Sequence, residues 1–380
     1  MTGMFKLSKT SSLPLHTQLL NELRHAILSG RLKPHDRLPG EFELVEQLGI
    51  SRTTIQKAWD AAEDEGLIYR VPAKGTYVAA PQQGQQVSRS VGFLVPQFLY
   101  TFDGDLLDGA EKVLRQHGYR LLFAQTERRV EEENRLLHTM CQEGVVGFLL
   151  WPVSDPEEKR ILSGENCRVP IVLLDRPIPG VALPCVTSRN YEGGMQIMTH
   201  LLELGHRRIA FLAWPHLNLW PIAERFRAYQ DAMRGAGLEP MAEPLYIGVP
   251  SSEATNYRRL AQSAQEDVQR LTILLSQPDR PTALFAMNDL VAMLALQAAR
   301  RAGVRVPEDL SIAGFDNLEM TEHVTPPLTT VAQDVRLMGA EAARRLLALI
   351  AGEPVQDVFT LLPTRLIVRE STGPAPKGGV

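Results

Sequence analysis

From residue 91 onward, short apolar runs alternate with segments of helical periodicity. The runs read VGFLVP, YRLLFAQ, VVGFLLWP, VPIVLLD, RRIAFLAW, TALFAM and LSIAGFD. Between them, apolar residues recur at helical spacing, which predicts helices near residues 105–117, 131–142, 193–204, 224–235, 263–275 and 289–302. Continuous apolar strands alternating with helices are typical of parallel sheets covered on both faces. Two successive cycles predict two doubly wound lobes, with a ligand in the cleft between them.

The first 80 residues follow a different pattern. Helical spacing predicts a helix over residues 15–28, a turn at RLKPHDRLPG and a short helix ending before Gly49. Ser51 is a plausible N-cap for a third helix running to about residue 65. The strands LIYR and GTYVA then predict a small hairpin. The order helix, short helix, turn, helix and hairpin predicts a winged helix-turn-helix.

A polar stretch separates these two parts. APQQGQQVSRS, residues 80–90, has no apolar periodicity and predicts a flexible linker between an N-terminal domain (1–79) and a C-terminal domain (91–372). Residues 373–380 are expected to be a disordered tail. The net charge of −4 divides into +1 for residues 1–80 and −5 for the rest. The overall acidity, which by itself argues against a polyanionic partner, therefore belongs to the C-terminal part.

The third predicted helix has the side chains that read duplex DNA. Residues 51–59 contain no acid, and short polar or cationic residues lie near the helix start, away from its apolar stripe. Such side chains can reach base edges in the major groove, and the hairpin tip can reach the backbone or the minor groove. The residues concerned are Arg52, Thr53, Gln56, Lys57 and Lys74. The alternatives are a winged helix that binds protein and, for Lys57 alone, a solvated position.

Aromatic and polar residues follow the predicted strands of the C-terminal domain. Rings can stack on the C–H face of a sugar while carboxylates and amides bind its hydroxyls. This pattern predicts a small polyhydroxylated ligand bound by Phe102, Asp103, Trp151, Asp175, Trp214, Trp220, Asn288 and Asp316. For Trp214 and Trp220 a lobe-surface or dimer position is the alternative, and Asp289 is expected to cap its helix rather than touch ligand.

Other classes of protein are disfavoured. Three acids could form a glycosidase carboxylate pair, but GxGxxG, Walker, GxSxG and HExxH motifs are absent. We therefore predict no enzyme activity, no cofactor and no metal site. The three cysteines form no CxxC pair and are expected to be reduced thiols, which suggests a cytoplasmic protein. No apolar run is long enough to span a bilayer, and the first residues lack the apolar core of a signal peptide.

The N-terminal part resembles the GntR family of bacterial regulators. The resemblance covers residues 14–79 and rests on LKPHDRLP, LGISRTT and KGTYV. It implies DNA contacts by Arg37, Ser51, Arg52, Thr53, Thr54 and Gly75. The chain departs from the family pattern in having Phe42 between two acids, Gln56 where Arg is common, and Ala73 for the first wing glycine. These departures leave the operator sequence open.

The C-terminal part resembles the sensor domain of the LacI/GalR family, which has a periplasmic-binding-protein-like fold. The resemblance covers about residues 91–372, with VPIVLLDRPIPG and ALFAMNDLVAMLALQAARRAGVRVPEDLSIAGFDN among its segments. It implies effector contacts by Phe102, Asp103, Asp175, Asn288 and Asp316, with Arg225 as a further candidate. It also implies one lobe of residues 91–187 and 332–363 and another of 188–331 and 364–372.

With both parts in this order, the chain resembles hybrid repressors that respond to arabinose. They imply a cytoplasmic homodimer that binds double-stranded operator DNA and is released by a small sugar, for which a pentose such as arabinose is the example. The polar linker takes the place of the LacI hinge helix, so signalling cannot depend on that helix. A corepressor-dependent or activating regulator and a solute receptor that does not bind DNA are the alternatives.

Overall fold

The computed structural model describes residues 5, 7, 14–28, 31–72, 74–80, 89–98, 101–153, 169–214, 219–247, 257–353 and 357–376. Most of the predicted linker lies outside these residues. The predicted tail lies outside them from residue 377, but its first part is held in place. The Ala375 N–H donates to the Leu204 carbonyl at 2.8 Å, and the Gly373 carbonyl contacts His206. The expectation of disorder is therefore wrong for residues 373–375.

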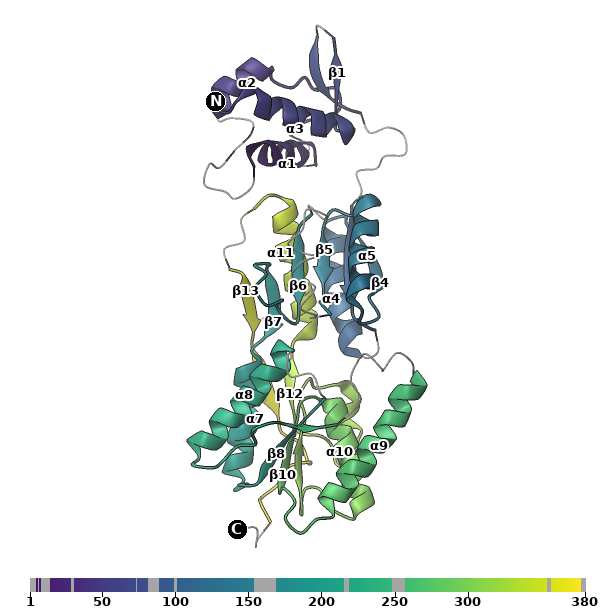
Figure 1. Cartoon of the computed structure of the whole chain (residues 1–380), viewed down its shortest axis with the longest axis vertical. Helices are drawn as coiled ribbons and strands as arrows, with labels where there is room; N and C mark the ends of the chain where they lie inside the picture. The colour runs from purple at the N-terminus through teal and green to yellow at the C-terminus, as the bar shows by residue number, and fades with distance from the viewer. Residues whose placement is uncertain are drawn as a thin grey trace.

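The N-terminal domain is a small helical domain with a β-hairpin wing (Figure 1). Its elements are α1 (Leu15–Leu28), α2 (Glu41–Leu48), α3 (Arg52–Asp64), β1 (Ile68–Val71) and β2 (Gly75–Val78). The strands pair antiparallel, with Val71 opposite Gly75. Trp59 and other apolar residues of α3 pack with α1, α2 and the hairpin in a single core. The predicted winged helix-turn-helix is confirmed.

The first lobe is built on a six-stranded parallel sheet in the order β13-β7-β6-β5-β3-β4. The strands are β3 (Ser90–Val95), β4 (Arg120–Gln125), β5 (Phe148–Leu150), β6 (Ile171–Leu174), β7 (Cys185–Ser188) and β13 (Phe359–Leu362). Helices α4 (Thr101–Gln116) and α11 (Val335–Ile350) share a core with one face, and α5 (Val130–Gln142) with the other. Side chains alternate accordingly: Phe93 faces α4, and Leu94 faces α5.

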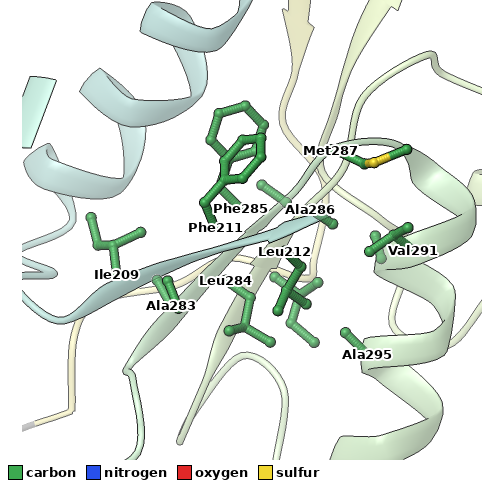
Figure 2. Packing of buried hydrophobic residues seen from close by; sticks show 14 of the residues in the cluster. Ile209, Phe211, Leu212, Ala283, Leu284, Phe285, Ala286, Met287, Val291 and Ala295 are labelled. Atoms are coloured by element: carbon green, nitrogen blue, oxygen red, sulfur yellow. The ribbon is translucent and has the colours of Figure 1, made fainter. Parts of the chain in front are cut away.

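The second lobe has a four-stranded parallel sheet in the order β11-β10-β8-β9. Its strands are β8 (Ile209–Ala213), β9 (Leu245–Tyr246), β10 (Ala283–Ala286) and β11 (Ser311–Ala313). Figure 2 shows Phe211 and Phe285 side by side, with Val291 and Ala295 on the neighbouring helix. The two phenylalanine rings are 4.9 Å apart, and Phe211 also contacts Tyr229. The core of this lobe lies between helices on both faces of the sheet.

The helices of the second lobe are α7 (Asn190–Glu203), α8 (Trp220–Gly235), α9 (Tyr257–Leu275) and α10 (Asp289–Ala302), with a 3-10 turn at Glu319–Glu322. Strands β12 (Thr330–Gln333) and β14 (Thr364–Ile367) form an antiparallel pair. The chain passes between the lobes at residues 188–190, 333–335 and 362–364. These passages place the carboxyl ends of strands from both sheets in one region.

Two further expectations concern the cysteines and the membrane. Cys185 is a buried free thiol, and burial raises its pKa, so it is inert. Cys141, by contrast, is disulfide-bonded, so the expectation of a reduced thiol is wrong there. Among the helices of the described residues, none is both long and apolar enough to cross a bilayer.

Candidate functional site

The recognition helix α3 begins with a capped first turn. The Ser51 backbone is extended, and its Oγ accepts a hydrogen bond from the Thr54 N–H at 3.2 Å. The same oxygen lies 2.8 Å from the Thr53 hydroxyl and 2.7 Å from that of Thr54. The predicted N-cap is confirmed. The other N–H groups of this first turn have no partner within the helix, and such groups can bind a phosphate.

Glu41, in the first turn of α2, fixes two of the predicted base-reading side chains. Arg52 donates through Nε to the Glu41 carboxylate at 2.7 Å, and Gln56 donates to the same oxygen at 3.4 Å. The Arg52 guanidinium also lies 5.0 Å from the centroid of the Phe42 ring. Arg52, Thr53 and the neighbouring Lys57 remain exposed. Glu41 thus orients the reading surface, a role that the sequence analysis missed.

The wing brings together the remaining DNA-binding candidates. Arg37 forms an isolated antiparallel bridge with Tyr77 of β2. Its guanidinium lies against Gly75, where an added Cβ would be 3.1 Å from Nε. Gly75 has φ of +122°, which favours glycine there. Lys74 is exposed at the tip, and its carbonyl accepts from the Tyr77 hydroxyl at 3.2 Å. Arg37 and Lys74 are thus exposed cations beside the wing and at its tip.

In the C-terminal domain, Arg225 of α8 is a buried cation held by several elements. It donates through Nε to Asn190 Oδ1 at 2.9 Å and through Nη1 to the Met287 carbonyl at 2.5 Å. Its Nη2 lies 3.5 Å from Asp316 Oδ1, and its guanidinium stacks 3.6 Å above the Phe315 ring. Only 5% of Arg225 is exposed. A charge this deeply buried must be paired, and these contacts pair it.

Two carboxylates follow strands of the two different sheets. Asp175 comes after β6 and has φ of +67°, whereas Asp316 comes after β11 and has φ of +113°. Non-glycine residues rarely adopt such angles, and backbone strain of this kind clusters at binding sites. The pKa of Asp316 is raised to about 6, mainly by burial and further by Asp175 and Asp103. Arg225 and a 2.7 Å hydrogen bond from Gln333 act in the opposite direction. The predicted acids of both lobes are therefore close enough to interact.

Aromatic residues border this charged cluster on the first-lobe side. The Trp151 ring lies 5.5 Å from the Phe102 ring and 5.5 Å from the Arg176 guanidinium. Its indole N–H is buried and has no hydrogen-bond partner among the described residues. Burial raises the pKa of Asp175, and the nearby Arg176, Arg225 and Trp151 indole lower it. The indole N–H nevertheless does not meet the geometry of a hydrogen bond to this carboxylate. A buried, unpaired donor beside a ring pair suits a ligand with acceptor oxygens.

Asn288 takes the capping role that was expected of Asp289, and its assignment as an effector contact stays a prediction. Asn288, not Asp289, caps α10, because its Oδ1 accepts from the Val291 N–H at 3.0 Å. The expected cap at Asp289 is therefore wrong. Asp289 is fully buried and accepts from the Thr330 hydroxyl at 2.5 Å and the Leu318 N–H at 2.8 Å. Burial and the Asp316 carboxylate raise the pKa of Asp289 to about 8, so it belongs electrostatically to the same cluster.

The two second-lobe tryptophans make no polar side-chain contact with the charged cluster among the described residues. Trp214 directly follows β8, is half-buried against the lobe core and donates its backbone N–H to Met287 Sδ at 3.1 Å. Trp220 is the first residue of α8. Within the described part of the chain, no polar contact joins either side chain to Arg225. Their assignment to the ligand site stays a prediction.

Sequence reasoning missed several members of the cluster. Asn190 opens α7 and Gln333 ends β12, at two of the passages between the lobes. Arg176 follows Asp175 directly and is buried. The signal that could have found them is their place beside predicted strand ends and crossovers. Across the described residues, no group of three or more His, Cys, Asp or Glu side chains could hold a metal ion.

Comparison with known proteins identifies both domains. Residues 15–78 match the family of bacterial regulatory proteins of the gntR type, and residues 198–372 match a periplasmic binding protein-like domain. Over 371 residues, the chain is 31% identical to an arabinose metabolism transcriptional repressor of Geobacillus stearothermophilus, covering 96% of this chain and 99% of the relative. It is also 31% identical to the transcriptional repressor CytR of Escherichia coli K12, over 76% of this chain and 81% of CytR.

Solved structures agree with this relationship. A complex of the transcriptional regulator CelR with cellobiose is 28% identical, covers 88% of this chain and 100% of that chain, and has a TM-score of 0.64. A transcription regulator GntR from Chromobacterium violaceum is 30% identical, covers 74% of this chain and 99% of that chain, and has a TM-score of 0.62. These relatives are regulators and not enzymes. The chain belongs to the family of transcriptional regulators that join a gntR-type winged helix to a periplasmic-binding-protein-like domain.

Proposed function

We propose that this regulator is a homodimeric repressor that leaves its operator when a small neutral sugar binds between the two lobes. The observation that carries the proposal is the buried cluster of Arg225 with Asp316 and Asp175. The two acids follow strands of different sheets, and both adopt backbone angles that are unfavourable without a function. We also propose the sequence-derived limits of the DNA-binding domain (1–79) and of the ligand-binding domain (91–372), with the ligand between the lobes of the latter.

The chemistry of the cluster favours a sugar. Carboxylates accept hydrogen bonds from hydroxyls, Arg225 and the Trp151 indole donate them, and the Phe102 and Trp151 rings offer a stacking face. The acids Asp103, Asp175, Asp289 and Asp316 outnumber the cations Arg176 and Arg225 in this cluster, which disfavours a sugar phosphate. The names of two relatives, which mention arabinose and cellobiose, support a saccharide, and a pentose such as arabinose is our first candidate.

On the DNA side, we propose that α3 enters the major groove and that the wing contacts the backbone. Arg52, Thr53, Thr54, Gln56 and Lys57 would then face bases and phosphates, with Ser51 fixing the helix start. Arg37 and Lys74, with Gly75 at the wing tip, would contact phosphates or the minor groove. Such a regulator acts in the cytoplasm, where operator DNA lies.

A dimer is supported by the edge of the first-lobe sheet. Strand β4 is an edge strand, and the exposed side chains of Leu122 and Phe123 lie on it, next to the half-exposed Phe98. An exposed apolar edge is a template for association. A two-fold dimer would present two winged helices to a pseudopalindromic operator. Ligand binding that moves one lobe against the other would then alter the spacing of the two recognition helices.

The test begins with a binding site selected from a random duplex library by the full-length chain. Candidate pentoses, hexoses and disaccharides are then titrated into the complex at fixed salt. We expect one sugar to lower operator affinity, and Asp316→Asn to lose that response while operator affinity without sugar stays unchanged. As a matched control, Asp309→Asn removes a partly buried, ion-paired acid outside the cluster and should respond normally. Tighter binding on adding sugar would establish a corepressor, and failure to select any duplex would leave a solute receptor.

A further inference from the structure

Phe42 is exposed beside the predicted reading surface. It lies in the first turn of α2, and 73% of it is exposed, more than any other large apolar residue in the described part of the chain. The core of its domain, which includes Leu44 two residues away, does not contain it. An exposed apolar ring at the edge of a binding surface suggests that the bound molecule carries an apolar group that covers this ring.

The neighbours of Phe42 restrict what that partner can be. The Arg52 guanidinium lies 5.0 Å from the ring centroid and donates through Nε to Glu41 at 2.7 Å. Its two terminal nitrogens make no hydrogen bond within the described residues and remain free for a bidentate contact. In duplex DNA, the commonest bidentate partner of arginine is guanine O6 and N7 in the major groove.

Geometry then places the ring beside the adjacent base pair. An arginine that binds guanine edge-on lies in the plane of that base, and the next base pair lies about 3.4 Å above or below this plane. The Phe42 ring, whose centroid lies 5.0 Å from the guanidinium carbon, can therefore reach the level of the neighbouring pair. The apolar group displayed there in the major groove is the C5 methyl of thymine.

We propose that Phe42 is a specificity-determining residue that contacts the thymine methyl on the base pair next to the guanine read by Arg52. The inference rests on the proposed operator binding and goes beyond it by assigning a two-base-pair element to two side chains. Glu41 is the positioning residue of this unit, because it holds the guanidinium in place. The element is a guanine with a thymine on one neighbouring base pair.

The test uses the selected duplex and the full-length chain. Each thymine is replaced singly by deoxyuridine, which removes only the methyl group, and each guanine by 7-deazaguanine, which removes N7. Dissociation constants are measured by fluorescence anisotropy for the wild type, Arg52→Ala, Phe42→Ala and Glu41→Gln. Ile273→Ala is the matched control, since it removes another exposed apolar side chain, on α9 in the second lobe.

We expect one guanine to be sensitive to 7-deaza substitution in the wild type and insensitive in Arg52→Ala. At a neighbouring base pair, deoxyuridine should weaken wild-type binding about fourfold, as expected for burial of one methyl group. Phe42→Ala should lose this sensitivity and Ile273→Ala should keep it. Glu41→Gln should reduce the guanine effect.

The proposal is overturned if no thymine beside the Arg52-dependent guanine distinguishes wild type from Phe42→Ala, even though a duplex was selected. Equal operator affinity of the two proteins, combined with a change in oligomeric state, would assign the ring to a protein contact instead. Failure to select any duplex would refute operator binding itself and this inference with it.

Discussion

Gly109 should tolerate no side chain, because α4 and α11 approach through it. A Cβ built on Gly109 would lie 1.9 Å from the Arg336 carbonyl oxygen, whereas real Cβ contacts stay above 3.0 Å. The reverse contact is as close, since a Cβ on Gly339 would lie 2.0 Å from the Leu106 carbonyl oxygen. In Gly109→Ala the two helices must therefore separate by about 1 Å. The obstacle is backbone, which no rotamer change can relieve.

The net effect can be estimated from two opposing contributions. Overpacking of this kind costs about 1–3 kcal/mol, here at the upper end because backbone must move. Alanine regains up to about 1 kcal/mol of helix propensity. We therefore expect a loss of about 2 kcal/mol, or roughly 4–8 °C in the unfolding temperature of the C-terminal domain. Because Phe102 and Asp103 lie in the first turn of α4, the sugar response should weaken as well.

Differential scanning calorimetry of the full-length chain provides the measurement, since it can separate the unfolding of the two domains. Gly104→Ala is the control in the same helix, because its Cβ would meet nothing closer than Phe98 at 4.0 Å. It should stabilise the domain by about 0.5–1 kcal/mol. If Gly109→Ala unfolds at or above the wild-type temperature, the close contact between α4 and α11 does not exist.

Three further predictions concern the cap, the buried cation and pH. Ser51→Ala should destabilise the N-terminal domain by about 1 kcal/mol and weaken operator binding, whereas Ser51→Gly should cost only a few tenths of a kcal/mol. Calorimetry measures the stability of each variant, and fluorescence anisotropy measures its operator affinity. Equal losses of stability in the two variants would exclude a capping role. Arg225→Met leaves Asp316 buried without its cation, so it should lower the free energy of unfolding by about 3–5 kcal/mol at pH 8. The loss should be smaller at pH 5, where the acid is protonated. Urea unfolding measures both values, and a loss that does not depend on pH would contradict the pairing. Burial raises the pKa of Asp289 to about 8, above its unfolded value, so its contribution is complete below about pH 4 and is lost as pH rises towards 8. Asp289→Asn should therefore flatten the fall in unfolding free energy between about pH 4 and 8, and parallel wild-type and variant curves would refute this.

Several elements could be read from the sequence because their signals are local. The helix over residues 15–28, the cap at Ser51 and the helix from Asp289 each depend on periodicity and on one capping or stop residue. The apolar runs likewise became strands of the two parallel sheets. Helices α8 and α9 begin earlier than predicted.

Other elements were not predicted from the sequence, and the strands among them carry only weak local signals. Strand β13 is an edge strand with the exposed residues Phe359 and Leu361, and β12 and β14 consist of four residues each. Helix α11 was not predicted, although it lies against α4 and shares its core. Which strand sits at an edge and which helices meet through glycine depend on contacts between residues far apart in the chain.

The sequence by itself determined the two domain types, the capped recognition helix and the acids that end the strands, because backbone periodicity and strand-end chemistry act over a few residues. Only the tertiary structure decided which of those side chains meet. It gathered Arg225, Asp175 and Asp316 from different lobes and gave the cap of α10 to Asn288. It also placed Glu41 against Arg52, eleven residues away. Burial, pairing and shifted pKa values arise from such long-range packing, which no local pattern encodes.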